Sequence, residues 1–249
     1  MPKPMRYIVI SDIHSNAPAL EAVLRDAPAF DALICLGDIV GYGPDPNVCV
    51  ERVQDFDLTC ISGNHDQGTI GQADVLIFNR DAREALSWTQ RELTPANLSF
   101  LCGLSPAGAL DDNGGIDLAH GSQRDPVWEY IVDPSAAAQN FRQFTFRLLL
   151  VGHSHLPLVF EWLSDAQRVQ PLRSEPGVPV HLDGRRMILN PGSVGQPRDG
   201  NPHASYAILD VEASTWTLHR TAYPVEITQE RMRAKGLPRR LIDRLEVGR

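Results

Sequence analysis

The histidines of this chain are concentrated in short motifs that also contain carboxylate or amide side chains. The motifs are Asp12-Ile-His14, Gly37-Asp38, Gly63-Asn64-His65-Asp66, His120-Gly121 and Gly152-His153-Ser-His155. Oxygen donors combined with imidazole nitrogens suit manganese, iron, zinc and similar ions. One ion does not need so many ligands, whereas two ions about 3.5–4 Å apart that share a carboxylate and a water would use all of them. The motifs therefore predict a site for two metal ions.

Each motif lies at the end of an apolar run of strand length. These runs occupy residues 7–10, 32–36, 58–61, 115–120 and 146–151. Uninterrupted apolar strands indicate a sheet buried on both faces, with helical crossovers between the strands. Asp12 and Asp38 are 26 positions apart, and so are Asp38 and Asn64, which suits a strand–helix–strand unit. Because ligands bind beyond the carboxyl ends of the strands in such sheets, we expect the motifs to meet at one edge.

The rest of the chain supplies helices and antiparallel strands around these runs. Asn16 can cap a helix, residues 47–53 and 79–93 have helical patterns, and Pro95 can start another helix. Segments 67–78 and 121–134 have the composition of loops. Alternating patterns predict strands at 158–162, 187–189, 205–211 and 216–220. With no low-complexity linker or repeat, residues 1–249 are expected to form a single domain.

Composition and charge exclude several classes of protein. The 249 residues are 43% hydrophobic and carry a formal net charge of −8, which disfavours a general nucleic-acid binder. No apolar stretch approaches the roughly 20 residues that a membrane span needs. The N-terminal apolar run is too short for a signal peptide and ends at Asp12. We therefore expect a cytoplasmic protein that does not associate with a membrane.

The last nineteen residues differ in charge from the rest. Residues 231–249 carry seven basic and two acidic side chains, a local charge of +5, so that the remainder of the chain carries −13. Such a segment can contact an anionic partner. It can equally be a solvated helix, or a helix packed on the acidic body of the protein.

The motifs resemble those of the calcineurin-like metallophosphoesterases, in particular their small bacterial phosphodiesterase-type branch. The matching stretches include the five motifs above, the continuation of Gly37-Asp38 as Ile-Val-Gly-Tyr-Gly-Pro-Asp-Pro, and Asn190-Pro-Gly-Ser-Val-Gly-Gln-Pro-Arg-Asp-Gly. The resemblance covers a motif-bearing core from residue 6 to about residue 211, and no motif lies in the basic C-terminal extension 231–249. It implies an α/β fold, a four-layer α/β/β/α sandwich, with the metal site at the carboxyl ends of the strands.

The resemblance also divides the ligands between two divalent transition-metal ions. It assigns Asp12, His14, Asp38 and His155 to the first ion, and Asp38, Asn64, His120 and His153 to the second, with Asp38 bridging. The residues alone predict convergence but not this division. Manganese is the expected metal, and iron, zinc, nickel or cobalt would suit the same oxygen and nitrogen donors.

The implied activity is hydrolysis of a small phosphodiester or phosphomonoester by in-line attack of a metal-bridging hydroxide, with the diester favoured. His65 is expected to bind the phosphoryl group and to stabilise or protonate the leaving oxygen. Asp66 is expected to hold the imidazole of His65 in one tautomer. These two residues are the predicted catalytic pair.

Substrate recognition is expected to lie in the two loops and near the metal site. Arg198 can pair with phosphate oxygens, although a salt bridge within its loop is an equal alternative. Trp128 and Tyr130 can stack on a base or an aryl group, or can simply anchor their loop. Homo-oligomers are compatible with the sequence, which shows no legible interface.

Three other interpretations remain open at the level of sequence. A nuclease would use the same chemistry, but the acidic charge and the lack of a basic groove disfavour it. A catalytically weak protein-interaction scaffold of the same fold is a second alternative, as in the retromer subunit. A metal-binding regulatory protein with incidental activity is the third. Retention of His65 and of every ligand position favours the enzyme.

Overall fold

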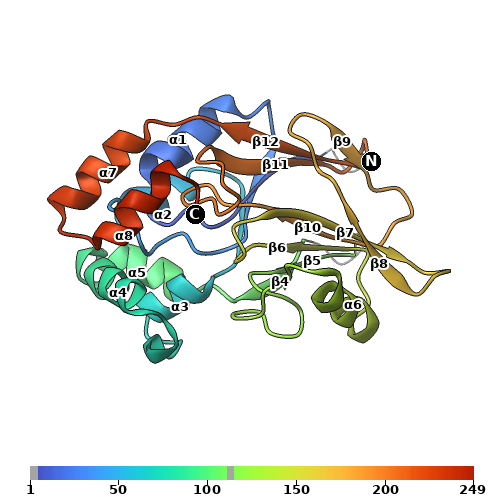
Figure 1. The fold of residues 1–249 in the computed structure, drawn as a ribbon, viewed down its shortest axis with the longest axis horizontal. Helices are drawn as coiled ribbons and strands as arrows, with labels where there is room; N and C mark the ends of the chain where they lie inside the picture. The colour runs from blue at the N-terminus through green and yellow to red at the C-terminus, as the bar shows by residue number, and fades with distance from the viewer. Residues whose placement is uncertain (1–4, 111–114) are drawn as a thin grey trace.

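A computed structural model of the chain describes residues 5–110 and 115–249. Within these residues, two six-stranded sheets lie at the centre (Figure 1). The first sheet contains β1 (Arg6–Ile10), β2 (Ala32–Cys35), β3 (Leu58–Cys60), β9 (Pro179–His181), β11 (Ala204–Asp210) and β12 (Thr215–Thr221). The second contains β4 (Ala107–Ala109), β5 (Ile116–Ala119), β6 (Leu148–Val151), β7 (Pro157–Leu163), β8 (Arg168–Leu172) and β10 (Met187–Pro191).

The strand orders are β3-β2-β1-β11-β12-β9 and β4-β5-β6-β10-β7-β8. In the first sheet β1, β2 and β3 are parallel, and in the second β5, β6 and β10 are parallel. The helices are α1 (Ala17–Asp26), α2 (Pro46–Val53), α3 (Asn64–Thr69), α4 (Arg80–Glu92), α5 (Pro95–Cys102), α6 (Pro134–Gln143), α7 (Val225–Ala234) and α8 (Arg239–Asp243). Short 3-10 helices occupy η1 (Val75–Ile77) and η2 (Arg244–Glu246).

Alternating side chains of the strands build separate cores on the two faces of each sheet. In β1, Val9 packs between the sheets, whereas Ile8 and Ile10 pack outward against α1 and α2. In β6, Leu150 faces the core between the sheets, and Leu149 faces α6. The layers are therefore helix, sheet, sheet and helix, with α1 and α6 on opposite outer faces (Figure 1). This confirms the expected α/β/β/α sandwich.

Local signals in the sequence account for most of the helix boundaries. The side chain of Asn16 caps α1 by accepting a hydrogen bond from the amide of Ala19 at 3.2 Å, as predicted. Asn79 caps α4 in the same way through the amide of Ala82 at 3.0 Å, and Pro95 begins α5.

One of the two expected loops needs correction, and the other is confirmed up to the start of α6. Segment 67–78 is not wholly a loop, because α3 extends to Thr69 and η1 forms a helical turn within it. Asp66 favours α3, because its carboxylate accepts a hydrogen bond from the amide of Gly63 at 2.9 Å and so stabilises the first turn of the helix. Segment 121–134 has no regular element before α6 begins at Pro134. Helix α6 itself was not expected, although Asp133 before Pro134 is a helix-start signal.

The basic C-terminal segment folds as helices that pack on the body of the protein. Its apolar side chains Leu241, Ile242 and Leu245 are buried in a cluster with Phe78 and Leu86 of the α4 region. Figure 1 accordingly shows α7 and α8 beside α4. Of the alternatives for this segment, the packed helix therefore describes its structure.

No helix in the described part of the chain has the length and apolar content that crossing a bilayer requires. The first four residues, which entered the expectation about a signal peptide, lie outside the described residues. That residues 1–249 form a single domain stays a prediction.

Candidate metal centre

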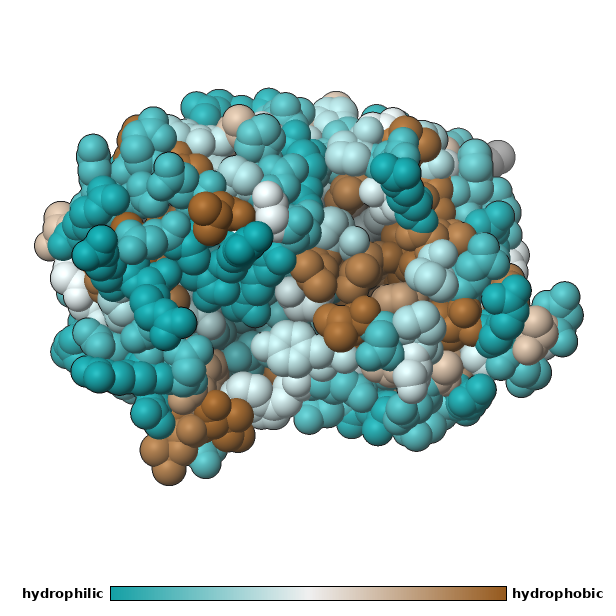
Figure 2. Space-filling view, viewed as in Figure 1, coloured by the Kyte–Doolittle hydropathy of each residue, from teal (hydrophilic) through white to brown (hydrophobic). Residues whose placement is uncertain are grey.

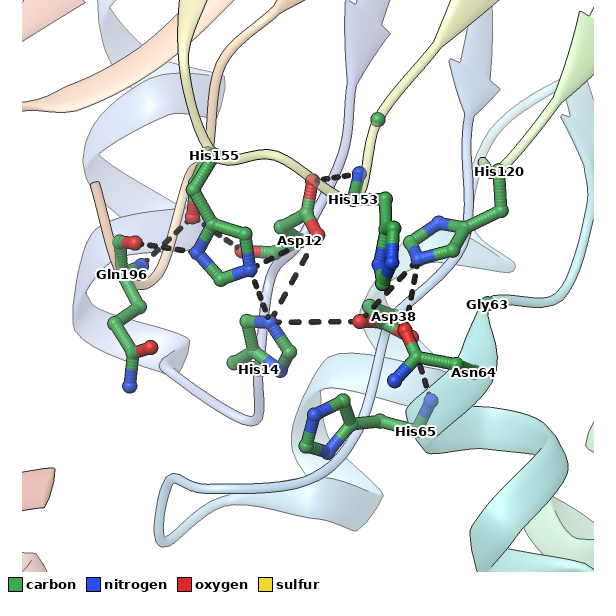
Figure 3. Close-up of polar contacts among 12 residues, drawn as sticks. Asp12, His14, Asp38, Gly63, Asn64, His65, His120, His153, His155 and Gln196 are labelled. Atoms are coloured by element: carbon green, nitrogen blue, oxygen red, sulfur yellow. Dashed lines mark hydrogen bonds and ion pairs between the residues drawn. The ribbon is translucent and has the colours of Figure 1, made fainter. Parts of the chain in front are cut away.

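The structure brings all seven predicted ligand residues to one edge of the two sheets, beyond the carboxyl ends of five parallel strands (Figure 3). Asp12 and His14 follow β1, Asp38 follows β2, Asn64 follows β3, His120 follows β5, and His153 and His155 follow β6. All seven side chains are buried. The strand-end placement predicted from the sequence is therefore observed.

The first cluster consists of Asp12, His14, Asp38 and His155, whose potential ligand atoms all lie within 4.8 Å of one another. The Nε2 atom of His155 is 3.2 Å from Asp12 Oδ1 and 3.1 Å from His14 Nε2. His14 Nε2 is 3.6 Å from Asp38 Oδ2. This is the same group of four that the resemblance assigns to the first ion.

The second cluster shares Asp38 and adds His120 and His153. His120 Nε2 lies 3.4 Å from Asp38 Oδ2 and 3.1 Å from Asn64 Oδ1, which brings the amide oxygen of Asn64 to the same place. Asp38 therefore lies between two groups of ligand atoms, in the position of a bridging carboxylate.

Backbone carbonyl groups orient the imidazoles toward the clusters. The Nδ1 atoms of His14, His120 and His155 lie 3.3, 2.8 and 2.5 Å from the carbonyl oxygens of Val40, Leu36 and Gln196. A proton on Nδ1 satisfies each carbonyl and leaves the lone pair of Nε2 directed at the cluster. His153 is reversed, because its Nε2 lies 3.2 Å from the carbonyl oxygen of Trp128 and its Nδ1 is left for the cluster.

Burial and mutual charge perturb the pKa values of these groups. Burial raises the pKa of Asp12 to about 7, and the nearby carboxylate of Asp38 adds to the rise. Burial also opposes ionisation of Asp38, but His120, His65 and His14 outweigh it and hold its pKa well below the usual range. For His120 burial is likewise outweighed, by the Asp38 carboxylate, and the pKa rises to about 10. Two buried carboxylates thus share the site, and His120 supplies the positive charge that offsets the carboxylate of Asp38.

The polar atoms of the clusters fit divalent ions. Asp12 Oδ1 and Asp38 Oδ2 are buried and accept no hydrogen bond from the described residues. Leaving a buried carboxylate oxygen without a partner is costly, and coordination to a cation would remove that cost. The donors are carboxylate and amide oxygens together with imidazole nitrogens, a set that suits first-row transition metals.

The backbone at the site adopts conformations that L-residues rarely use. Five ligand residues have left-handed backbone: Asp12 (φ 53°), His14 (φ 49°), Asp38 (φ 53°), His153 (φ 62°) and His155 (φ 59°). Gly63 is required for a different reason, since a Cβ atom there would lie 2.1 Å from Asp38 Oδ1. The glycine in Gly-Asn-His-Asp thus permits the close approach of α3 to the shared carboxylate.

His65 lies beside the clusters without belonging to either of them. Its imidazole lines a cavity and packs against the rings of Tyr42 (4.2 Å between centroids) and Phe78 (4.9 Å). In Figure 3 no dashed line reaches its ring, and its Nδ1 is buried without a partner among the described residues. Burial lowers the pKa of His65 to about 4.

The expected contact between Asp66 and the imidazole of His65 is not present. The Asp66 carboxylate instead accepts the amides of Gly63 at 2.9 Å and Val40 at 3.1 Å. Both amides belong to the loops that carry ligands, since Gly63 precedes Asn64 and Val40 follows Asp38. As the third residue of α3, Asp66 points back to the helix start, where it fastens these two loops together.

A cavity of about 440 Å³ opens beside the clusters, and the predicted substrate residues lie on its wall. Arg198 has a buried Nε atom without a partner and, among the described residues, no ion pair with a carboxylate, so the loop salt bridge is not observed. The ring of Tyr130 stacks on His153 at 3.9 Å, and that of Trp128 packs edge-on against Phe78 at 5.2 Å.

Two further parts of the cavity wall come from segments outside the named substrate residues. One is Ile77 with Phe78, from segment 67–78, which is one of the two loops expected to recognise the substrate; they lie at the end of the exposed apolar turn η1, in which Leu76 is 73% exposed. Figure 2 shows apolar surface on the projection at the lower left, where Figure 1 draws this turn. The other is Arg244, from the C-terminal segment. Its only signal in the sequence is the excess of basic residues there.

Comparison with known proteins agrees with this geometry. The sequence profile of the calcineurin-like phosphoesterase superfamily domain matches residues 5–214. A metallophosphoesterase from Sphaerobacter thermophilus is 42% identical, and its structure superposes with a TM-score of 0.90 over 99% of this chain and 100% of that chain. A protein of Methanocaldococcus jannaschii is 37% identical over 245 residues, 97% of each chain. A hypothetical protein from Pyrococcus horikoshii OT3 shares the fold, with 22% identity and a TM-score of 0.78 over 98% of both chains.

These matches span nearly the whole chain and confirm the resemblance that the motifs carried. The chain belongs to the calcineurin-like phosphoesterase superfamily.

Proposed function

We propose that this protein is a dinuclear metal-dependent phosphoesterase that hydrolyses a small phosphodiester or phosphomonoester, with the diester preferred. The observation that carries the proposal is the pair of buried ligand clusters that share Asp38 at the base of a cavity. A single structural ion would not require the second cluster, and a binding scaffold would not require His65 beside it.

The seven ligand residues would hold two divalent ions, for which manganese is our first expectation. Iron, zinc, nickel and cobalt suit the same donors. Such ions would supply Lewis acidity, which polarises phosphoryl oxygens and makes a water easier to deprotonate. The protein prepares for this by presenting the Nε2 atoms of His14, His120 and His155 close to the carboxylates of Asp12 and Asp38.

The remaining side chains of the cavity would bind and orient the ester for in-line displacement at phosphorus. Arg198 has no carboxylate partner among the described residues, and its guanidinium would pair with the phosphoryl oxygens. The ring of His65, held by Tyr42 and Phe78, would contact the phosphoryl group and stabilise the leaving oxygen with the N–H of its neutral imidazole. Asp66 would position both ligand loops through the amides it accepts.

The aromatic part of the wall supports the preference for a diester. Trp128 and Tyr130 lie beside the second cluster and would contact the second ester group, which a monoester lacks. The cavity volume of about 440 Å³ fits a small molecule rather than a duplex. We therefore propose a small phosphorylated substrate and no nucleic acid. The four cysteines are free thiols, which supports a reducing, cytoplasmic location.

Metal analysis and hydrolysis assays test the proposal together. We would measure metal content by mass spectrometry on protein purified without added metal, and then assay bis(p-nitrophenyl) phosphate and p-nitrophenyl phosphate with Mn²⁺. We expect about two ions per chain, as the shared Asp38 requires, and faster turnover of the diester. Turnover of the monoester alone would reverse the preference. If no metal is bound and neither ester is turned over, the enzyme hypothesis is contradicted and the protein-interaction scaffold is favoured.

A further inference from the structure

A second cavity lies beside the metal pocket, between the start of α4 and the end of the chain. Its volume is about 690 Å³, and its wall includes Arg80, Arg240, Arg244 and Arg249. Asn79 and Arg244 line both cavities, so the two are neighbours that share a wall. Figure 2 shows hydrophilic side chains gathered around the C-terminus, where the second cavity lies.

The wall of this cavity carries more cations than acidic groups. Beside the four arginines lie the side-chain carboxylate of Asp81 and the main-chain carboxyl group of Arg249, the last residue. Among residues 5–110 and 115–249, none of these arginines forms an ion pair with a side-chain carboxylate. Other cations of the same segment do: Arg231 pairs with Asp45 at 3.0 Å, Lys235 with Glu92 at 3.7 Å and Arg239 with Asp243 at 3.2 Å. Within the described residues, three of the segment's other cations are therefore paired with side-chain carboxylates, whereas its cavity arginines are not.

The C-terminal segment that carries three of these arginines packs on the body of the protein. Leu241 and Leu245 are buried against the α4 region, and Gln229 of α7 donates to the carbonyl oxygen of Ile242 at 3.0 Å. Arg244 lies between these anchors, half-buried, and its Nε donates to the main-chain carboxyl oxygen of Arg249. Burial lowers the pKa of Arg244, and the nearby guanidinium groups of Arg198 and Arg240 lower it further, while Tyr42 opposes them.

We propose that this basic cavity is a subsite for a second phosphoryl group of the substrate, one that the enzyme binds but does not hydrolyse. Guanidinium groups pair with phosphate oxygens through two parallel hydrogen bonds, and phosphate carries enough charge to satisfy several of them. Arg244 and Asn79 connect the subsite to the metal pocket. The inference rests on the proposed phosphoesterase function and restricts its substrates to small phosphoesters that carry a further phosphate.

Two matched substrates measure the contribution of the subsite. The p-nitrophenyl ester of thymidine 5′-phosphate has one phosphate, and its 3′-phosphorylated derivative has two, with thymidine serving only as a spacer. We expect kcat/KM of the full-length, metal-loaded protein to be about tenfold higher for the derivative, as charge-assisted pairing with arginine implies. Loss of two arginines in the variant Arg240→Ala/Arg249→Ala should lower that ratio about fivefold.

The control removes one positive charge from α8, the helix that carries Arg240, without changing the cavity. Arg239→Ala deletes an exposed arginine that pairs with Asp243 and does not line the cavity, so the ratio should stay at the wild-type value. Arg240→Lys should keep part of the preference, because the charge remains. A ratio of about one in the wild type, or a ratio unaffected by the double variant, would overturn the subsite.

A binding measurement separates failure of the subsite from failure of the proposed function. Calorimetric titration with thymidine 3′,5′-bisphosphate and with thymidine 5′-phosphate requires no turnover. If neither ester is hydrolysed, tighter binding of the bisphosphate by the wild type than by Arg240→Ala/Arg249→Ala still supports the subsite. Equal binding by both proteins rejects it.

Discussion

The proposed site has two contrasting parts. The ligand cluster consists of the seven predicted metal ligands. The arginine rim consists of Arg198, Arg240, Arg244 and Arg249. The ligand cluster is buried, comes from the ends of parallel strands, and has three of its imidazoles fixed by backbone carbonyls. The arginine rim comes from a loop and from the C-terminal segment, and its four residues are half-buried or exposed.

This difference separates general chemistry from selection of the substrate. Ions in the ligand cluster would act on any phosphoryl group, because every phosphate offers them the same oxygens. The arginine rim can distinguish phosphates by what else the molecule carries. We therefore expect substitutions in the ligand cluster to lower turnover of all substrates, and substitutions in the arginine rim to change the order of preference among them.

The largest effect should follow from Asp38→Asn, which removes the charge shared by both parts of the ligand cluster. Since the ions contribute several kcal/mol to the transition state, we expect turnover to fall about 10³-fold. Metal content per chain should fall with it, as mass spectrometry can show. Asp210→Asn is the matched control and should retain both properties, because Asp210 lies opposite Arg6 at the start of β1, away from the ligands that follow the end of that strand. Full metal content in Asp38→Asn would contradict the bridging position.

A second prediction tests whether packing holds the arginine rim in place. Leu241 is only 3% exposed and belongs to the apolar cluster under the rim. Leu241→Ala should lower the free energy of unfolding by about 2–3 kcal/mol, as measured by urea denaturation. Val247, 51% exposed in the same segment, provides the control, because Val247→Ala should cost less than about 0.5 kcal/mol. Similar values for the two variants would show that the segment is not anchored.

His65→Ala sharpens the comparison from within the pocket, because His65 lies beside the ligand cluster without being part of it. We expect turnover to fall at least about tenfold while the metal content is retained, since a hydrogen-bond donor at the developing charge of a leaving oxygen contributes this much or more. His203→Ala, an exposed histidine outside every motif, should leave turnover unchanged. Unchanged turnover in His65→Ala would remove this residue from the proposed mechanism.

Arg198→Ala tests the part of the arginine rim closest to the ligand cluster. Its main chain amide donates to the carbonyl oxygen of His155 at 3.3 Å, and its side chain lines the cavity. We expect KM to rise about tenfold and kcat to change less, because the lost interaction binds ground state and transition state alike. A fall in kcat with an unchanged KM would instead place Arg198 in the chemical step.

The smallest effect concerns a carboxylate remote from both regions. The amide of Ala213 and the guanidinium of Arg6, 2.9 Å away, lower the pKa of Asp210 in the folded protein. Its contribution to stability is therefore present above the unfolded pKa of about 4 and is lost as the pH falls through the folded pKa. Asp210→Asn should cost less than about 1 kcal/mol at pH 7, and urea denaturation should show this difference vanishing in acid.

The sequence predicted the ligand cluster better than the arginine rim for a physical reason. Asp12, Asp38 and Asn64 follow strands whose apolar runs are continuous, so the parallel sheet alone brings them together. Arg244 reaches the cavity only through the packing of α7 and α8 on α4, and no local pattern encodes a contact between residues so far apart. The predicted contact between Asp66 and the imidazole of His65 was wrong for a related reason. The backbone amides of Gly63, at the start of α3, and of Val40 donate to the Asp66 carboxylate instead.

The fold itself was predictable where strands and caps had clear signals. Asn16, Asn79 and Pro95 marked helix starts correctly. The short strands β4 and β9, at the edges of their sheets, have too few residues to show a period, and their pairing depends on neighbours that the sequence does not identify. Comparison with other proteins bears on the family and the fold, whereas the roles of individual site residues stay predictions.

The left-handed turns at the ligand residues have a consequence for how the sequence can change. Asp12, His14, Asp38, His153 and His155 each hold a backbone conformation that costs about 1 kcal/mol or more relative to the usual regions. Glycine at any of them would relieve that cost and delete a ligand at the same time. Selection for thermal stability alone would therefore erode the site, and only selection for activity would keep these five side chains where they are.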